Sequence, residues 1–252
     1  MISAIAALVA MAGSAFAQTQ AVAHQVKLKG DPAAKVGTIL SSDGRTVQFQ
    51  TQAGSIGFPL VNIELVTMAP PPEYDLMQKA VSQRDTEKSG QFALALTTKF
   101  KGLPVTWMKT AYVTGISYLI GKDLTKAKAL NAEMNQLYPG GGGLQAKVNQ
   151  ALISIEEKDV LSARDALVSI TEEALKAKNV PSDNALAYSQ AFYALGRVQE
   201  ADGKLQDALE NYLRTVTIFF NDPSSKAAAQ ERADALRAKN KGRKTSDQLT
   251  VP

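Results

Sequence analysis

The feature that most constrains the fold is a short pattern that occurs four times in the last two thirds of the chain. Each occurrence is a turn rich in Gly, Lys and Asp, with a small residue six positions after its start. Successive small residues are separated by 38, 36 and 45 positions, which predicts a structural unit that repeats at a similar period. The four small residues are Ser89, Ala127, Ala163 and Ala208.

A small side chain at the same place in each unit indicates helices that cross closely. Where the two helices of a hairpin cross, only a very small side chain lets the backbones approach to about 8 Å. Apolar residues between the turns have helical spacing, and clusters containing Gly or Pro interrupt them at 102–104, 139–143, 179–181 and 221–223. We therefore expect helical hairpins, stacked side by side, over residues 74–239.

The preceding segment, residues 26–68, has the pattern of short strands. The Asp-Gly pair at 43–44 is typical of a tight hairpin turn, because Gly tolerates a positive φ angle. Val47 and Phe49 alternate with polar residues, which gives their strand one dry face. A second turn follows at 52–54. Four or five short strands in this length predict a small all-β meander or barrel.

The segments around these two regions set the domain organisation. Three consecutive prolines at 70–72 lack amide donors and end the strand region, so we expect a proline-rich linker at 69–73. Residues 240–252 are basic and poor in apolar side chains, which predicts a disordered basic tail. The expected fold is mainly α: a helical-hairpin repeat array preceded by a small all-β module.

The first residues have the features of an export signal. Residues 1–17 carry no charge, contain an apolar run and end in Ala-Phe-Ala, the small-x-small pattern that signal peptidase cleaves. The run is shorter than the ~20 residues that a membrane span needs, although an uncleaved anchor is the alternative. The chain has no cysteine, so it has neither disulfides nor a lipid-modified cysteine. We expect a periplasmic or secreted protein.

Two of the four units carry residues that resemble a known family. The run Thr-Gly-Ile-Ser-Tyr at 114–118 and the run Leu-Gly-Arg-Val-Gln at 195–199 precede two of the turns, and Pro139 ends a unit. Residues 73–238 resemble the tetratricopeptide-repeat family, which implies a solenoid whose concave face binds another protein. The strand segment resembles the small barrels of Src-homology or Sm-like shape, and the whole layout resembles exported bacterial repeat proteins.

The residue types that carry most enzyme chemistry are scarce. His24 is the only histidine and lies near a terminus, so we expect a solvated surface residue, and histidine-based triads and histidine-rich zinc sites are excluded. The glycine run 140–143 is not followed by Lys-Ser or Lys-Thr, so we interpret it as a loop, not a phosphate cradle. We predict no enzymatic activity, no cofactor and no metal site. An enzyme would depend on carboxylates brought together across repeats.

The candidate binding residues are those that the tetratricopeptide resemblance places on the concave face. In that family the concave surface is built from first-helix positions that face away from the second helix. A tyrosine beside a cation suits a groove that grips a peptide, because the ring offers area and the charge sets the register. The alternative is that the tyrosines pack in the core between repeats. The predicted residues are Lys109, Tyr112, Ile116, Gln190, Tyr193 and Arg197.

These observations predict a non-enzymatic protein-interaction scaffold of the cell envelope, which binds a partner segment on the concave face. The alternative is a structural envelope protein that self-assembles. The net charge of +4 comes from basic and acidic residues that are mixed along the helical part, and an exported chain does not meet cytoplasmic RNA, so we expect no nucleic acid partner. The basic tail is expected to contact anionic lipid or cell-wall polymer weakly.

Overall fold

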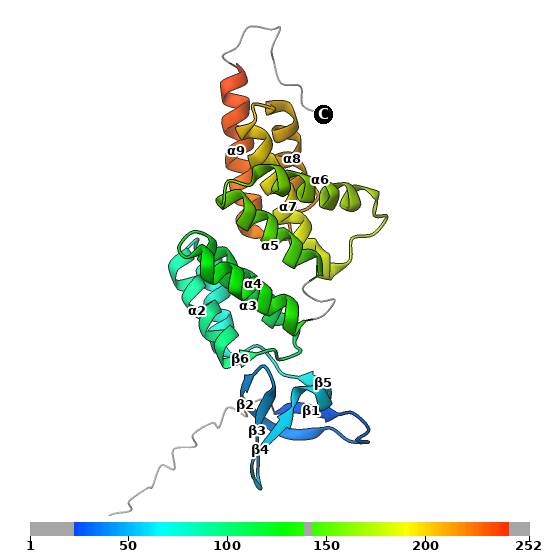
Figure 1. Cartoon of the computed structure of the whole chain (residues 1–252). Coiled ribbons are helices and arrows are strands. Elements are labelled where there is room, and N and C mark those ends of the chain that lie inside the picture. The colour runs from blue at the N-terminus through cyan, green and yellow to red at the C-terminus, as the bar shows by residue number, and fades with distance from the viewer. Residues whose placement is uncertain (1–22, 139–142, 242–252) are drawn as a thin grey trace, which may run out of the picture.

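A computed structural model describes residues 23–138 and 143–241 of the chain. A small antiparallel sheet lies at one end of the molecule, and the helices stack away from it (Figure 1). The expectation of a mainly α fold, with a helical-hairpin array after a small β-module, is confirmed. The predicted signal peptide at 1–17 and residues 242–252 of the predicted tail lie outside the described residues.

In the described part of the chain, the sheet is built from five short consecutive strands and a sixth strand that comes later in the sequence. The strands are β1 His24–Leu28, β2 Lys35–Asp43, β3 Thr46–Thr51, β4 Gly54–Pro59 and β5 Ile63–Thr67. Their order is β4-β3-β2-β1-β5, so the long β2 pairs with both β1 and β3 and the sheet curls around an apolar interior. A short 3-10 helix, Leu60–Asn62, separates β4 from β5. The fully buried Val26, Val47 and Phe49 fill the interior.

His24 has a structural role in this sheet, and the prediction of a solvated histidine is wrong. Its Nδ1 atom accepts a hydrogen bond from the backbone N–H of Ile39 at 2.9 Å, and the residue is only partly exposed. Its partner in the β1–β2 register is Gly37. The sequence analysis missed this bond because it depends on the register between two strands, not on the residues next to His24.

Over the described ranges, the helices form four successive hairpins followed by one more helix. The hairpins are α1 Pro72–Ser82 with α2 Thr86–Lys99, α3 Thr106–Ile120 with α4 Leu124–Leu137, α5 Gly143–Glu156 with α6 Val160–Lys176, and α7 Ser182–Ala201 with α8 Leu205–Thr217; α9 is Pro223–Lys241. The first helix begins at Pro72 because proline, which lacks an N–H, suits the first turn of a helix. None of these helices within the described ranges is long and apolar enough to cross a membrane.

The same local geometry recurs at the start of the second helix of each hairpin. Asp85, Asp123 and Asp159 are the N-cap residues of α2, α4 and α6, and each side chain accepts a hydrogen bond from the backbone N–H three residues later. The small residue of the repeat lies four positions after the N-cap. All four small residues are buried, with Ser89 5% exposed and the three alanines fully covered, as their role at helix crossings predicts.

The helices contact one another along the chain and also in a second row. Each helix contacts the next, and the first helices of successive hairpins contact one another from α3 through α5 and α7 to α9. In addition, α1 contacts α9. The first and last helices of the array therefore touch.

The sheet and the first two hairpins share one core. The strand β6, Phe100–Lys101, pairs in parallel with β2 immediately after α2 ends. Trp107 on α3 donates from its indole N–H to the carbonyl of Met68 at 3.3 Å, and its ring makes an edge contact with Phe100. Buried residues of the sheet, such as Phe49, belong to the same apolar cluster as Met77 and Trp107. The β-module is thus fastened to the base of the array.

Candidate functional site

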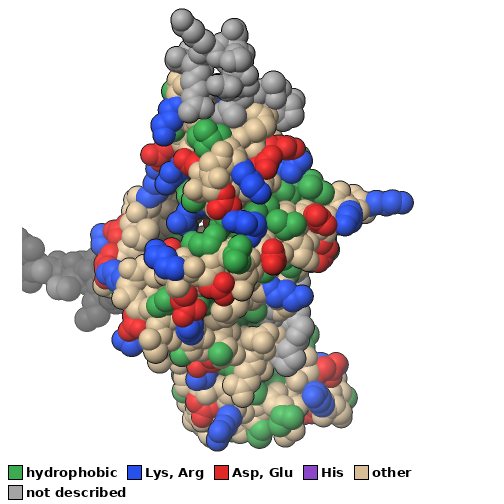
Figure 2. Space-filling view, turned by 45° about the horizontal axis from the view of Figure 1, so that its top comes forward, with side chains coloured by type: hydrophobic (Ala, Val, Ile, Leu, Met, Phe, Trp, Pro, Cys, Tyr) green, Lys and Arg blue, Asp and Glu red, His purple; other side chains and the backbone are tan. Residues whose placement is uncertain are grey.

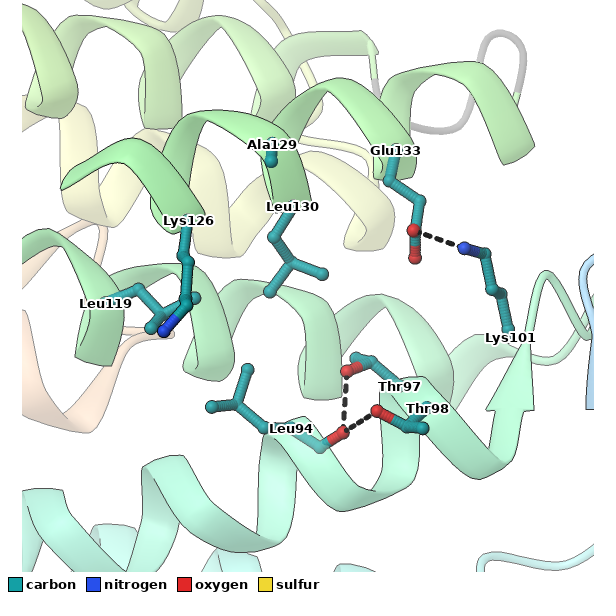
Figure 3. Close-up of a pocket in the computed structure, with 9 residues that line it drawn as sticks. All are labelled: Leu94, Thr97, Thr98, Lys101, Leu119, Lys126, Ala129, Leu130 and Glu133. Carbon is teal, nitrogen blue, oxygen red and sulfur yellow. Dashed lines mark hydrogen bonds and ion pairs between the residues drawn. The ribbon is translucent and has the colours of Figure 1, made fainter. Parts of the chain in front are cut away.

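The candidate functional site is an open groove of about 330 Å³ on the second-helix side of the first two hairpins (Figure 3). We call it the α2–α4 groove, because α2 and α4 form its walls and α3 contributes to its floor. It ends at β6. The lining residues are Leu94, Thr97, Thr98, Lys101, Leu119, Lys126, Ala129, Leu130 and Glu133.

The middle of the groove is apolar. Leu94 from α2, Leu119 from α3 and Leu130 from α4 converge there (Figure 3). Gly115 on α3 allows this convergence: a Cβ atom at this position would lie 3.3 Å from Leu94 Cδ2 and 3.4 Å from Leu130 Cδ2. A larger residue would push the two leucines apart, so the glycine helps to shape the floor.

Charged side chains lie at the two ends of this apolar patch. At one end, Lys101 Nζ is 2.5 Å from Glu133 Oε2, and the hydroxyl of Tyr112 donates to Glu133 Oε1 at 2.8 Å. Burial, and then the neighbouring Glu133, raise the pKa of the Tyr112 hydroxyl well above its ordinary value, so this group stays protonated and donates. At the other end is Lys126, whose side chain is 73% exposed and pairs with Asp123 at 3.1 Å.

The polar groups of the groove are engaged in structural contacts. The hydroxyls of Thr97 and Thr98 both donate to the carbonyl of Leu94, at 3.0 and 2.8 Å. Glu133 already accepts from Lys101 and Tyr112. Over residues 23–138 and 143–241, no group of three or more His, Asp or Glu side chains could hold a metal ion. The arrangement suits the binding of an apolar segment that carries a charge, because the leucines offer area and the lysines offer direction.

No family model, no curated protein and no solved structure matches this chain. The function is therefore argued from geometry and charge. On the face shown in Figure 2, Lys and Arg side chains are interspersed with Asp and Glu, without a large field of one sign. Individual charged side chains, not a long-range electrostatic field, would select a ligand on this face.

Three of the predicted binding residues are buried, which corrects the prediction for them. Tyr112 and Ile116 on α3 are fully covered, and Gln190 on α7 is 8% exposed. Tyr112 faces its own second helix, as its bond to Glu133 of α4 demonstrates. Ile116 belongs to the core shared by the sheet and the first hairpins. The prediction failed because the face that a first helix exposes depends on how it crosses its neighbours.

Gln190 belongs to a buried chain of side-chain amides. Its Oε1 accepts from Gln145 Nε2 at 2.7 Å, and the same Gln145 nitrogen lies 3.1 Å from Asn149 Oδ1. Asn149 in turn donates to Asn131 on α4 at 3.1 Å. The chain of amides connects α4, α5 and α7, so Gln190 joins successive hairpins inside the array.

The other three predicted residues are partly exposed. Lys109 lies on α3, and the Tyr193 ring on α7 is 6.0 Å from that of Tyr212 on α8. Arg197 lines a second hollow of about 330 Å³ between α7 and α9, together with Glu200, Ala201 and Arg232.

The charges in this second hollow are largely balanced. Arg197 is 4.0 Å from Glu156, and Arg232 is 3.5 Å from Glu200. The Tyr212 hydroxyl also donates to Glu200, at 2.7 Å. Both guanidinium groups thus have a carboxylate nearby, as the two lysines of the α2–α4 groove do, so the charges do not distinguish the two hollows. The second hollow differs in its lining, which contains no leucine.

The sequence analysis did not identify the residues of the α2–α4 groove. Leu94, Leu130 and Lys126 lie on second helices, whereas the tetratricopeptide resemblance places the binding residues on first helices. A signal existed in the sequence: exposed small or polar positions such as Thr98 and Ala129 lie beside leucines at helical spacing. That signal does not distinguish a groove from an ordinary amphipathic face.

Proposed function

We propose that the chain is a non-enzymatic protein-interaction scaffold of the cell envelope, built on helical hairpins of the tetratricopeptide type. Its α2–α4 groove binds an amphipathic segment of a partner protein. The observation that carries this proposal is the apolar middle of the groove, where the half-buried Leu94 and Leu130 pack over the buried Leu119 between charged ends. Four hairpins with a buried small residue at the same position support the repeat assignment.

The groove suggests the chemistry of the partner segment. Its apolar side chains would cover the exposed parts of Leu94 and Leu130, and the burial of apolar area would supply most of the affinity. A carboxylate on the segment would lie near Lys126, whose ammonium group extends into solvent. Because such a contact is exposed, it would contribute to orientation and to association rate more than to affinity.

The placement in the envelope rests on the predicted signal peptide at 1–17. Its removal gives a mature chain that begins at Gln18 and is found outside the cytoplasm. Mass spectrometry of the protein from fractionated cells tests this part alone, because an intact first segment or a cytoplasmic location contradicts the envelope assignment without affecting the groove.

The groove itself is tested by filling it from an exposed position. Ala129 lines the groove on α4 and is exposed, so Ala129→Arg adds bulk and charge there without removing a core side chain. Ala132, also exposed on α4, does not line the groove and provides the matched control Ala132→Arg. We expect the wild type and Ala132→Arg to capture the same envelope proteins, and Ala129→Arg to lose at least one of them.

Two measurements complete this experiment. Circular dichroism and thermal unfolding establish that both variants keep the fold, since arginine has a high helix propensity. The captured protein is then identified, and its binding to wild type and variants is measured with purified components. Equal binding by Ala129→Arg and Ala132→Arg would exclude the α2–α4 groove as the binding surface.

A further inference from the structure

The strand β4 leaves one edge of the sheet open. It is the terminal strand in the order β4-β3-β2-β1-β5, and among the described residues its only ladder is with β3. An open edge presents unpaired backbone N–H and C=O groups, which can pair with another strand. Proteins usually protect such edges with charged side chains, most often lysine, with proline, with short strands, or by covering them. At β4 the only such device within the strand is Pro59 at its end.

This edge has no charged residue to protect it. From Thr46 to Ile63, which includes β3, β4 and the short helix after it, the sequence contains no Asp, Glu, Lys or Arg. This is the longest uncharged stretch within the described ranges, in a chain with 21% charged residues. Near the centre of β4, the side chain of Ile56 is 45% exposed.

The register of β3 with β4 determines which backbone groups face outward. Thr51 and Gly54 flank the two-residue turn, and pairs of an antiparallel ladder alternate between hydrogen-bonded and non-bonded from there. Ser55 and Gly57 therefore direct their N–H and C=O groups away from β3. Pro59, which has no N–H, falls at a position that does not need one.

We propose that β4 pairs antiparallel with β4 of a second copy of the chain. A two-fold axis at Ile56 places Ser55 of each copy opposite Gly57 of the other, and each such pair exchanges two N–H···O=C hydrogen bonds. The two Ile56 side chains then lie opposite each other at the non-bonded position, where the strands are closest. The strand is complementary to itself in this register.

The same features favour a second copy over another occupant. The register centred on Ile56 uses both outward N–H groups of each strand and requires no N–H group at Pro59. Because the stretch 46–63 is uncharged, two identical edges do not repel each other, whereas strands with a net charge would. A single short strand pair buries little area, so the dimer is expected to be weak and dependent on concentration.

Cysteine crosslinking tests this geometry directly, because the natural chain has no cysteine. Directly opposite residues at a non-bonded antiparallel position have Cα atoms about 4.5 Å apart, within the range that a disulfide spans. We expect the full chain carrying Ile56→Cys to form a covalent dimer on mild oxidation, and a reducing agent to reverse it. Val61→Cys is the control, because Val61 is 72% exposed but lies beyond the end of β4.

Sedimentation velocity on uncrosslinked protein provides an independent measurement. The wild type and Val61→Lys should associate as concentration rises, and Ile56→Lys should remain monomeric at concentrations where they are dimers. Circular dichroism confirms that both variants fold. The proposal is overturned if the wild type stays monomeric, if Ile56→Lys associates equally, or if Ile56→Cys crosslinks no faster than Val61→Cys.

Discussion

Two glycines, Gly90 and Gly196, leave no room for a side chain beside a ring of the neighbouring helix. A Cβ atom at Gly90 would lie 2.1 Å from the ring of Tyr118, and one at Gly196 would lie 2.6 Å from the ring of Tyr212. Both distances are shorter than any van der Waals contact, so a methyl group would force the helices apart. Together with the buried alanines of the repeat, these residues show that the hairpins depend on the absence of side-chain bulk at a few positions.

The position of His24 in the sheet predicts how its imidazole titrates. Burial lowers the pKa of its imidazole below the ordinary 6.5. A folded-state pKa below the unfolded value means that the stabilising contribution is present above pH 6.5 and is lost as the pH falls through the folded value. Protonation of Nδ1 would remove the acceptor for the Ile39 N–H.

Proton NMR measures the pKa of His24 directly, because the chain has a single histidine and its ring signals need no assignment. We expect a midpoint below 6.5 for the folded protein and a higher midpoint in urea. The free energy of unfolding should decrease as the pH is lowered through the folded midpoint. A folded midpoint equal to or above the urea value would contradict the hydrogen bond to Ile39.

The second helices of the hairpins begin with the same type of N-cap residue, with a single exception. Three begin after an aspartate N-cap, but α8 begins after Lys204, which makes no side-chain capping bond. The backbone at Lys204 has φ −81° and ψ 64°, almost the same as the −85° and 65° of Asp159 at the start of α6. The fourth hairpin therefore has the geometry for a cap and lacks the side chain.

Lys204→Asn is expected to supply the missing cap. An asparagine oxygen can accept from the backbone N–H three residues later, as Asp159 does. We expect the variant to gain about 1 kcal/mol of stability, which raises Tm by about 2–4 °C in a protein of this size. Asp159→Ala is the reciprocal variant and should lose a similar amount. An unchanged or lower Tm for Lys204→Asn would contradict the equivalence of the hairpin starts.

The positions of the turns could be predicted from the sequence, but the exposed faces of the helices could not. Turns depend on local chemistry, such as the Asp-Gly pair at 43–44 and the aspartates that cap the second helices. Whether Tyr112 faces a partner or Glu133 depends on the crossing of α3 and α4, which no local pattern encodes. The α2–α4 groove is harder still to predict, because it is the space between helices of different hairpins.

At the scale of the whole molecule, the chain consists of a small curled sheet and an array of helical hairpins that the sheet anchors. The sheet shares its core with the first two hairpins, and α1 contacts α9. Two surfaces of the described residues are proposed to bind a partner: the α2–α4 groove on the second-helix side and the edge of β4 on the sheet. The two surfaces lie on different elements, so partner binding and self-association can be tested separately.

The stacking of the hairpins rests on the small residues at the helix crossings, and substitution by leucine tests it most directly. Chemical unfolding should show that Ala127→Leu, Ala163→Leu and Ala208→Leu each cost about 1–3 kcal/mol, because every one of these alanines is fully buried. Ala132→Leu, at an exposed position of α4, should stay within about 0.5 kcal/mol of the wild type. If the three crossing variants were as stable as Ala132→Leu, the helices would not be held together at these positions.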